Sequence, residues 1–133
     1  MKKIIAFTSI IIALVGLSLY AKPFFNDKTM KKSEVLKKWG AEKLDYEKFK
    51  SGSPEIKSKM AYSIMTSKEI VGKSVDFIRE KFGSPDGFYF IDVYPAYIIQ
   101  EGTNSKEETW QIVFKLNEKY QVREIVVHKN CCN

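Results

Sequence analysis

The spacing of apolar residues changes about two thirds of the way along this chain. Before Gly87 the apolar residues recur every three or four positions, as Ile56, Met60 and Ile64 do, which is the period of an amphipathic helix. After Gly87 apolar and polar residues alternate over several short stretches, which is the period of a β-strand. The pattern therefore predicts a helical first part that is followed by a sheet.

Three helix starts are indicated by capping residues. Ser33, Ser53 and Ser74 each precede a stretch with helical period, and a serine hydroxyl can accept a hydrogen bond from the free amides of a first helical turn. Pro54 suits the first position of a helix that is capped by Ser53. Gly83 is expected to end the third helix, because glycine favours the backbone conformation of a helix C-cap.

The second part of the chain contains four stretches with strand character, namely Gly87–Tyr94, Ala96–Gln100, Thr109–Leu116 and Val122–His128. Pro95 follows the first of them, so Gly87–Tyr94 is expected to be an edge strand or an irregular one. The alternation in the last stretch breaks near Arg123-Glu124, which predicts a β-bulge there.

This order of elements predicts the α+β fold class. We expect a small antiparallel sheet of about three to four strands, with the helices packed on one of its faces. In the third stretch Trp110, Ile112 and Phe114 share one face, and Gln111 and Val113 lie on the other.

The most apolar part of the chain is Met1–Ala21. Two lysines precede Ile4–Tyr20, which carries no charge, and this arrangement is typical of a secretory signal peptide or a membrane anchor. Ala21 offers a small residue for cleavage, but Leu19 departs from the preferred small residue two positions earlier. The run is also at the short end of the roughly 17–25 residues that span a bilayer. Both interpretations stay open, and either predicts an exported protein that is periplasmic or membrane-anchored facing the periplasm.

The formal net charge of +6 is unevenly distributed. Lys22–Lys50 contains nine lysines and five acidic residues, whereas Ser51–Asn133 contains eleven basic and eleven acidic residues. We expect residues 22–52 to form a basic tether and an amphipathic helix, and residues 53–133 to form the α+β domain. The lysines suit a solvated face or contact with anionic lipid headgroups. A neutral domain without a nucleic-acid-binding motif predicts no nucleic-acid partner.

A dense group of aromatic residues is the first candidate site, and it comprises Phe88, Tyr89, Phe90, Tyr94, Tyr97 and Trp110. About half of the rings in Phe88–Tyr97 are expected to pack under the helices. The others, together with Trp110, would form an exposed patch that binds a partner protein.

The second candidate site lies near the C-terminus, where His128 is followed by Cys131 and Cys132. Thiolate and imidazole ligands suit a soft metal ion such as Cu(I) or Zn²⁺. The alternative is a disulfide between neighbouring cysteines, which would be strained and easily reduced. This site is the basis of an alternative hypothesis, a periplasmic protein with a metal-linked or redox-linked role.

We find no sequence motif that indicates a catalytic activity. Gly72-Lys73-Ser74 lacks the earlier glycine of a phosphate-binding loop, since Ser67 occupies that position. No serine, cysteine and histidine arrangement marks a nucleophile. We therefore expect a protein that is not an enzyme and that needs no cofactor.

One segment allows a comparison with a known family. The stretch from Val71 to Asp86 combines a polar turn, a short capped helix and Gly83-Ser84-Pro85-Asp86, and it resembles small envelope proteins of the SmpA/OmlA (BamE-like) family. Trp110–Phe114, a turn and Val122–Val127 resemble the closing hairpin of that family. The resemblance spans roughly Met60–Val127 and implies two helices on a three-stranded antiparallel sheet, a fold shared with β-lactamase-inhibitor-like modules.

The same resemblance implies a non-enzymatic role in the cell envelope, with another envelope protein as the partner. This chain has no cysteine at the end of its apolar run, so it departs from the lipid-anchored members of the family. The N-terminal segment would contact the membrane if it is not cleaved.

Overall fold

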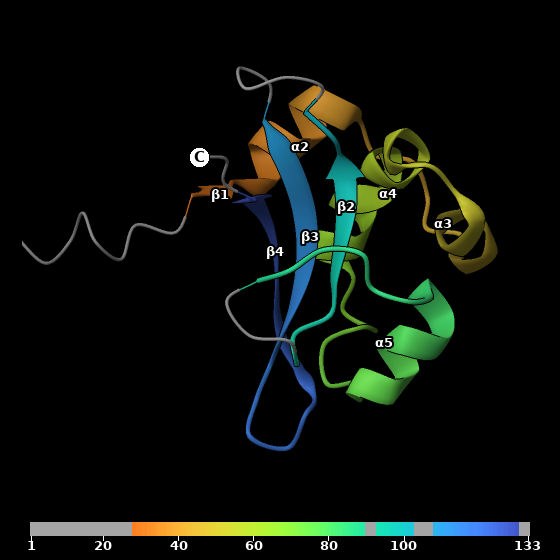
Figure 1. Ribbon diagram of the computed structural model, residues 1–133, viewed down its shortest axis with the longest axis vertical. Coiled ribbons are helices and arrows are strands. Elements are labelled where there is room, and N and C mark those ends of the chain that lie inside the picture. The colour runs from red at the N-terminus through yellow and green to blue at the C-terminus, as the bar shows by residue number, and fades with distance from the viewer. Residues whose placement is uncertain (1–27, 90–92, 103–107, 131–133) are drawn as a thin grey trace, which may run out of the picture.

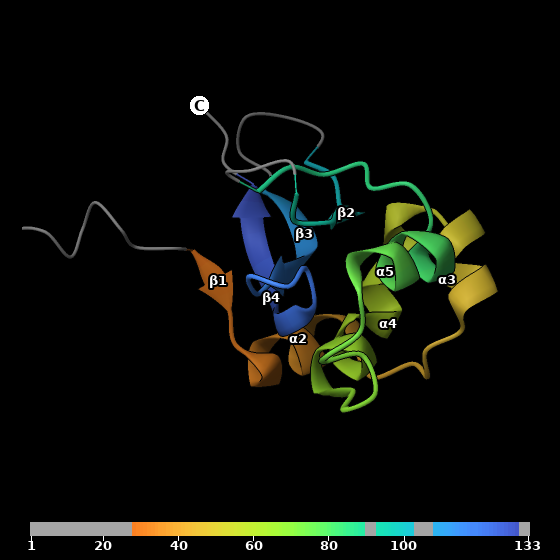
Figure 2. The same cartoon turned by 90° about the horizontal axis from the view of Figure 1, so that it is seen from below.

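The computed structural model describes residues 28–89, 93–102 and 108–130. The described residues form an α+β fold, with helices on one side of a four-stranded sheet (Figures 1 and 2). The helices are α2 (Lys32–Trp39), α3 (Tyr46–Ser51), α4 (Pro54–Thr66) and α5 (Val75–Phe82). The strands are β1 (Thr29–Met30), β2 (Ala96–Gln100), β3 (Thr109–Leu116) and β4 (Val122–Asn130).

The sheet has the order β1-β4-β3-β2, and every neighbouring pair is antiparallel. β3 and β4 form its central hairpin, in which Ile112 faces Val127. Near the turn, Lys115 faces Glu124 but Leu116 faces Val122, so that Arg123 is an extra residue on β4. This shift confirms the bulge that the broken alternation predicts.

The helix starts agree closely with the capping residues in the sequence. The hydroxyl of Ser53 accepts a hydrogen bond from the amide of Ile56 at 3.4 Å, and α4 begins at the next residue. The hydroxyl of Ser74 accepts one from the amide of Phe77 at 3.2 Å, and α5 follows it. α2 begins at Lys32, one residue before the predicted cap Ser33.

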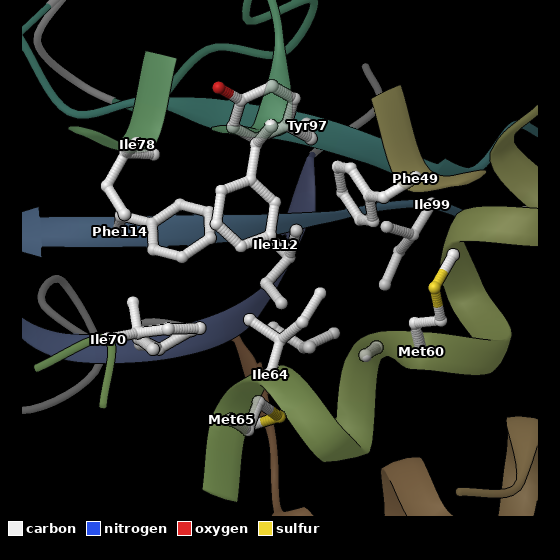
Figure 3. Close-up of a cluster of buried hydrophobic side chains, with 14 of the residues drawn as sticks. Phe49, Met60, Ile64, Met65, Ile70, Ile78, Tyr97, Ile99, Ile112 and Phe114 are labelled. Carbon is white, nitrogen blue, oxygen red and sulfur yellow. The ribbon is translucent and has the colours of Figure 1, made fainter. Parts of the chain in front are cut away.

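One hydrophobic core lies between the helices and the facing side of the sheet (Figure 3). Its largest fully buried members come from helices and strands alike: Phe49, Met60, Ile64, Ile78, Phe82, Tyr97, Ile99, Ile112 and Phe114. The hydroxyl of Tyr97 donates a hydrogen bond to the buried carbonyl of Gly83 at 2.7 Å. This bond joins β2 to the end of α5, where Gly83 has a φ of +89°.

The packed unit begins before the boundary that was expected at Ser53. Val35 of α2 and Phe49 of α3 are fully buried in the same core as Ile64 of α4. Thr29–Met30, which was expected to belong to a tether, pairs with His128 and Val127 of β4 as an edge strand. Residues 29–51 are therefore part of the α+β unit, because their apolar side chains complete its core.

The expected strand at Gly87–Tyr94 is absent from its described residues. Gly87 and Phe88 have no regular structure, Tyr89 forms a single β-bridge, and residues 90–92 lie outside the described part of the chain. The segment crosses the sheet face that is opposite the helices (Figure 1). There Tyr89 packs against Val113 and Val126 in a second, smaller apolar cluster. The second face is thus partly covered by a loop.

Among the described residues, no helix is both long and apolar enough to cross a membrane. Met1–Ala21, the expected signal or anchor helix, lies outside the described residues.

Candidate functional site

A groove lies at the end of the β3–β4 hairpin. Two adjoining hollows of about 540 and 280 Å³ share Tyr94, Leu116, Asn117 and Glu118. The larger hollow extends along the hairpin to Arg123, and the smaller one is lined by Val93 and Tyr120. We call these two hollows together the hairpin groove.

The turn that forms one wall of the groove is organised by Asn117. Its side-chain oxygen accepts hydrogen bonds from the amides of Lys119 at 2.9 Å and Gln121 at 3.1 Å. Its backbone amide donates to the carbonyl of Gln121 at 2.8 Å, and its carbonyl accepts from the amide of Tyr120 at 3.0 Å. Asparagine suits this place because its short side chain can bond the backbone of the residues that follow it.

Tyr120 has a φ of +58°, and it is the one non-glycine residue with positive φ among the described residues. A side chain in the left-handed region costs roughly 1–2 kcal/mol, since its Cβ comes too close to the backbone. Glycine avoids that cost. Tyr120 is 57% exposed, so burial in the core does not offset the strain. An exposed aromatic ring is therefore held at the groove in a conformation that favours glycine.

The opposite wall of the groove comes from the loop that crosses the second sheet face. Gln111 is fully buried, and its side-chain amide donates to the carbonyl of Phe88 at 2.5 Å and accepts from the amide of Phe88 at 2.9 Å. The amide of Gly87 donates to the carbonyl of Ala96 at 2.9 Å. These bonds hold the first part of the loop on the sheet. Farther along the same loop, Val93 and Tyr94 line the groove.

The structure does not bring the six predicted aromatic residues together on one surface. Tyr97 and Trp110 are buried in the main core, on the side of the sheet that the helices cover. Tyr89 is buried in the second cluster on the other side. Burial removes these three rings from the surface, which corrects the expectation that Trp110 extends an exposed patch.

Two of the remaining aromatic residues are accessible. Phe88 is 54% exposed, and Tyr94 is half-buried at the groove. Phe90 lies outside the described residues. Tyr94 is thus the one predicted residue that the structure places in the hairpin groove.

The histidine of the alternative site is buried beside the second cluster. The Nδ1 atom of His128 lies 3.4 Å from the side-chain nitrogen of Gln111. The ring of Tyr89 meets the imidazole edge to face, with a distance of 4.7 Å between the ring centres. Cys131 and Cys132 lie outside the described residues. Within the described ranges, no three histidine, cysteine or acidic side chains are grouped to hold a metal ion.

The groove residues Val93, Tyr120 and Arg123 were not identified from the sequence. One signal did point to this region, because the broken alternation at Arg123-Glu124 located the bulge. A second signal was the turn itself, which needs a residue with positive φ and has Tyr120 where glycine is favoured. The groove also depends on Val93, which the fold brings to the hairpin from a distant part of the sequence.

No protein-family model matches this chain, and neither does any curated protein or solved structure.

Proposed function

We propose that this protein is a non-catalytic interaction module of the cell envelope, and that it binds another envelope protein through the hairpin groove. The observation that carries the proposal is the strained and exposed Tyr120 at the groove. Strain of this kind persists where the surrounding structure enforces it, and it is concentrated at functional sites. A tyrosine also offers a large apolar area and a hydroxyl group to a partner.

The composition of the groove supports recognition of a protein segment. Val93, Tyr94 and Leu116 contribute apolar surface, and Val93 and Tyr120 are among the exposed large apolar residues. Glu118 and Arg123 add one charge of each sign at the same place. Apolar anchors surrounded by polar groups are the usual arrangement of a protein-binding surface.

Export and an envelope partner belong to the same proposal. They are supported by the uncharged run Ile4–Tyr20 behind two lysines, and by the resemblance of Met60–Val127 to the SmpA/OmlA family. His128 contacts Gln111 and Tyr89 inside the fold, which supports a packing role for it. The groove is therefore preferred to the metal or redox alternative.

Site-specific photo-cross-linking in intact cells tests the proposal. A benzophenone amino acid replaces Tyr120 in one variant and Glu55 in another, and cross-linked products are identified by mass spectrometry. Glu55 is the control, because it is exposed on α4 beside Gln100, at the end of the sheet that is opposite the hairpin turn.

We expect an envelope protein to be cross-linked from position 120 and not from position 55. The substitution Val93→Ser should reduce the yield from position 120, because it removes apolar surface from the same groove. Equal products from both positions, or no product from position 120, would contradict the proposed role of the groove.

A further inference from the structure

The whole net charge of the protein belongs to its first forty residues. They contain eight lysines and two acidic residues, whereas the remaining residues contain fourteen basic and fourteen acidic side chains. Five of the eight lysines lie in the described part, at β1 and α2. A surface that is positive over one region and neutral elsewhere attracts anionic partners to that region.

The geometry of α2 places several of these charges at the surface beside an exposed apolar residue. Val35 points into the core and is fully buried, whereas Lys32 and Lys37 are exposed. Leu36 lies one helical turn after Lys32 and is 41% exposed. Lys31 and Lys28 continue the positive surface toward β1 and are exposed as well. We call Lys28, Lys31, Lys32, Leu36 and Lys37 the basic face.

The chain that leads to the basic face contains the uncharged run Ile4–Tyr20. Only the seven residues Ala21–Asp27 separate that run from Lys28, where the described structure begins. Seven residues reach at most about 25 Å when fully extended. If the run lies in a bilayer as an anchor, β1 and α2 are the elements that follow it most closely along the chain.

We propose that the basic face docks on the surface of a bilayer that contains anionic lipids. Lysine side chains near such a surface are attracted to the negatively charged headgroups. Leu36 is placed to enter the boundary between headgroups and acyl chains, as the apolar residues of interfacial helices do. The anchor and the basic face then act as two linked membrane contacts, and each strengthens the other through proximity.

An anionic lipid surface fits these observations better than a nucleic acid does. Leu36 offers an apolar side chain among the lysines, which a phosphate backbone would leave in water. The preceding uncharged run suits a bilayer as well. The proposal does not depend on the hairpin groove.

Lysine labelling of the reconstituted full-length chain tests the proposal. The protein is placed in vesicles of pure phosphatidylcholine or of phosphatidylcholine with 30% phosphatidylglycerol as the probe. An amine-reactive reagent is added, and the labelling rate of each lysine is followed by mass spectrometry. Lys59, Lys68 and Lys81 are internal controls, since they lie on or beside α4 and α5.

In anionic vesicles we expect labelling of Lys31, Lys32 and Lys37 to slow by about tenfold or more, with the three control lysines unchanged. The effect should disappear at 1 M salt, where the Debye length falls to about 3 Å. Equal rates in both kinds of vesicle would overturn the proposal. So would slower labelling of the control lysines alone, or protection that requires added RNA and is absent with anionic lipid.

Two triple variants distinguish docking through the basic face from a general effect of the protein's net charge. Lys31→Gln, Lys32→Gln and Lys37→Gln together should abolish the protection of Lys28 in anionic vesicles. The matched variant with Lys59→Gln, Lys68→Gln and Lys81→Gln loses the same net charge and should keep that protection. If both variants lost the protection of Lys28 equally, the protection would depend on total charge, and the proposal that the basic face docks on the bilayer would be overturned. Cross-linking from position 120 reports on the groove separately, so the failure of one proposal is distinguishable from failure of the other.

Discussion

The side chain of Gln111 bonds both polar backbone atoms of Phe88, with distances of 2.5 Å to its carbonyl oxygen and 2.9 Å to its amide nitrogen. One buried side chain thus takes the place of strand pairing at Phe88. The replacement explains why a segment with strand composition crosses the sheet face instead of extending the sheet. It also makes one side chain responsible for holding Phe88 on the sheet, in the loop whose later residues Val93 and Tyr94 line the groove.

The substitution Gln111→Met should free the Phe88 segment and leave the main core folded. It removes the two hydrogen bonds to Phe88 and the polar contact with His128, and we expect the free energy of unfolding to fall by about 2 kcal/mol. Amide hydrogen exchange at Phe88 should become much faster, while exchange at Ile112 should keep its protection. Gln100→Met is the control, because Gln100 donates one hydrogen bond to Glu108 and does not touch the segment. If exchange at Phe88 is unchanged in Gln111→Met, the role given to Gln111 is wrong.

The substitution Tyr120→Gly should stabilise the protein and weaken partner binding together. Glycine relieves the positive φ, so we expect the free energy of unfolding to rise by about 1 kcal/mol. Loss of the exposed ring should remove a contact from the groove and reduce capture of the partner. Lys119→Gly is the matched control in the same turn. Since Lys119 is not among the residues with positive φ, glycine there should destabilise the protein by about 0.5–1 kcal/mol.

Urea unfolding measures both changes in stability. A Tyr120→Gly variant that is less stable than the wild type would show that the tyrosine is not strained in the turn. A Tyr120→Gly variant that gains stability and still binds the partner normally would show that partner binding needs neither the strain nor the ring of Tyr120.

Tyr97 should make the stability of the protein fall at alkaline pH. Burial raises the pKa of its phenol above the ordinary value of 10.0, and its hydroxyl donates to Gly83. The folded chain therefore holds this proton more tightly than the unfolded chain does. The resulting contribution to stability is fully present below pH 10 and is lost progressively as the pH rises above it.

Tyr97→Phe tests this dependence. It should lower the free energy of unfolding at pH 7 by about 1–2 kcal/mol, because the buried carbonyl of Gly83 loses its partner. It should also reduce the further loss of stability between pH 9 and pH 11, as measured by urea unfolding. Tyr120→Phe removes an exposed hydroxyl and should change stability at pH 7 by less than about 0.5 kcal/mol. An unchanged alkaline slope in Tyr97→Phe would contradict the assignment.

Substitution of Lys57 and substitution of Asp86 should lower the stability of the protein by different amounts. The ammonium of Lys57 is nearly buried, lies 5.4 Å from the ring centre of Phe49 and is 3.9 Å from a carboxylate oxygen of Asp86. The other carboxylate oxygen accepts a hydrogen bond from the amide of Ile98 at 2.9 Å. Lys57→Met keeps the packing and removes the buried charge, so it should cost less than about 1 kcal/mol.

Asp86→Ala should cost more, about 1–2 kcal/mol, because it removes two partners at once. Asp86→Asn keeps an oxygen for Ile98 and should lie between the two variants. Thermal unfolding at pH 7 ranks the three. The opposite ranking, with Lys57→Met the least stable, would show that the ring contacts of the ammonium outweigh the ion pair.

Local signals in the sequence predicted much of the fold. Ser53 and Ser74 cap their helices through contacts three residues away, and such contacts are visible in a short stretch of sequence. The alternation in Thr109–Leu116 and the bulge at Arg123 follow from the period of two in a strand. These features could be predicted because each depends on neighbouring residues alone.

Features that depend on distant contacts were missed. The pairing of Thr29–Met30 with β4 joins residues about one hundred positions apart, and two residues carry no strand pattern of their own. Gly87–Tyr94 has the composition of a strand, but the side chain of Gln111 already occupies the polar backbone atoms of Phe88. The aromatic residues predicted an exposed patch, but Tyr89, Tyr97 and Trp110 are buried. The number of rings in a stretch of sequence does not say which of them the rest of the fold covers.

The length of β4 has a consequence for how a partner reaches this protein. β1 pairs with β4 at His128, and the hairpin turn lies at the other end of the same strand (Figure 1). The six steps from Val122 to His128 measure about 20 Å at the rise of a β-strand. A molecule that rests on a bilayer through α2 would thus present its groove at about that height above the lipid. β4 then serves as a spacer, and a partner would need to project at least that far from the membrane to be recognised.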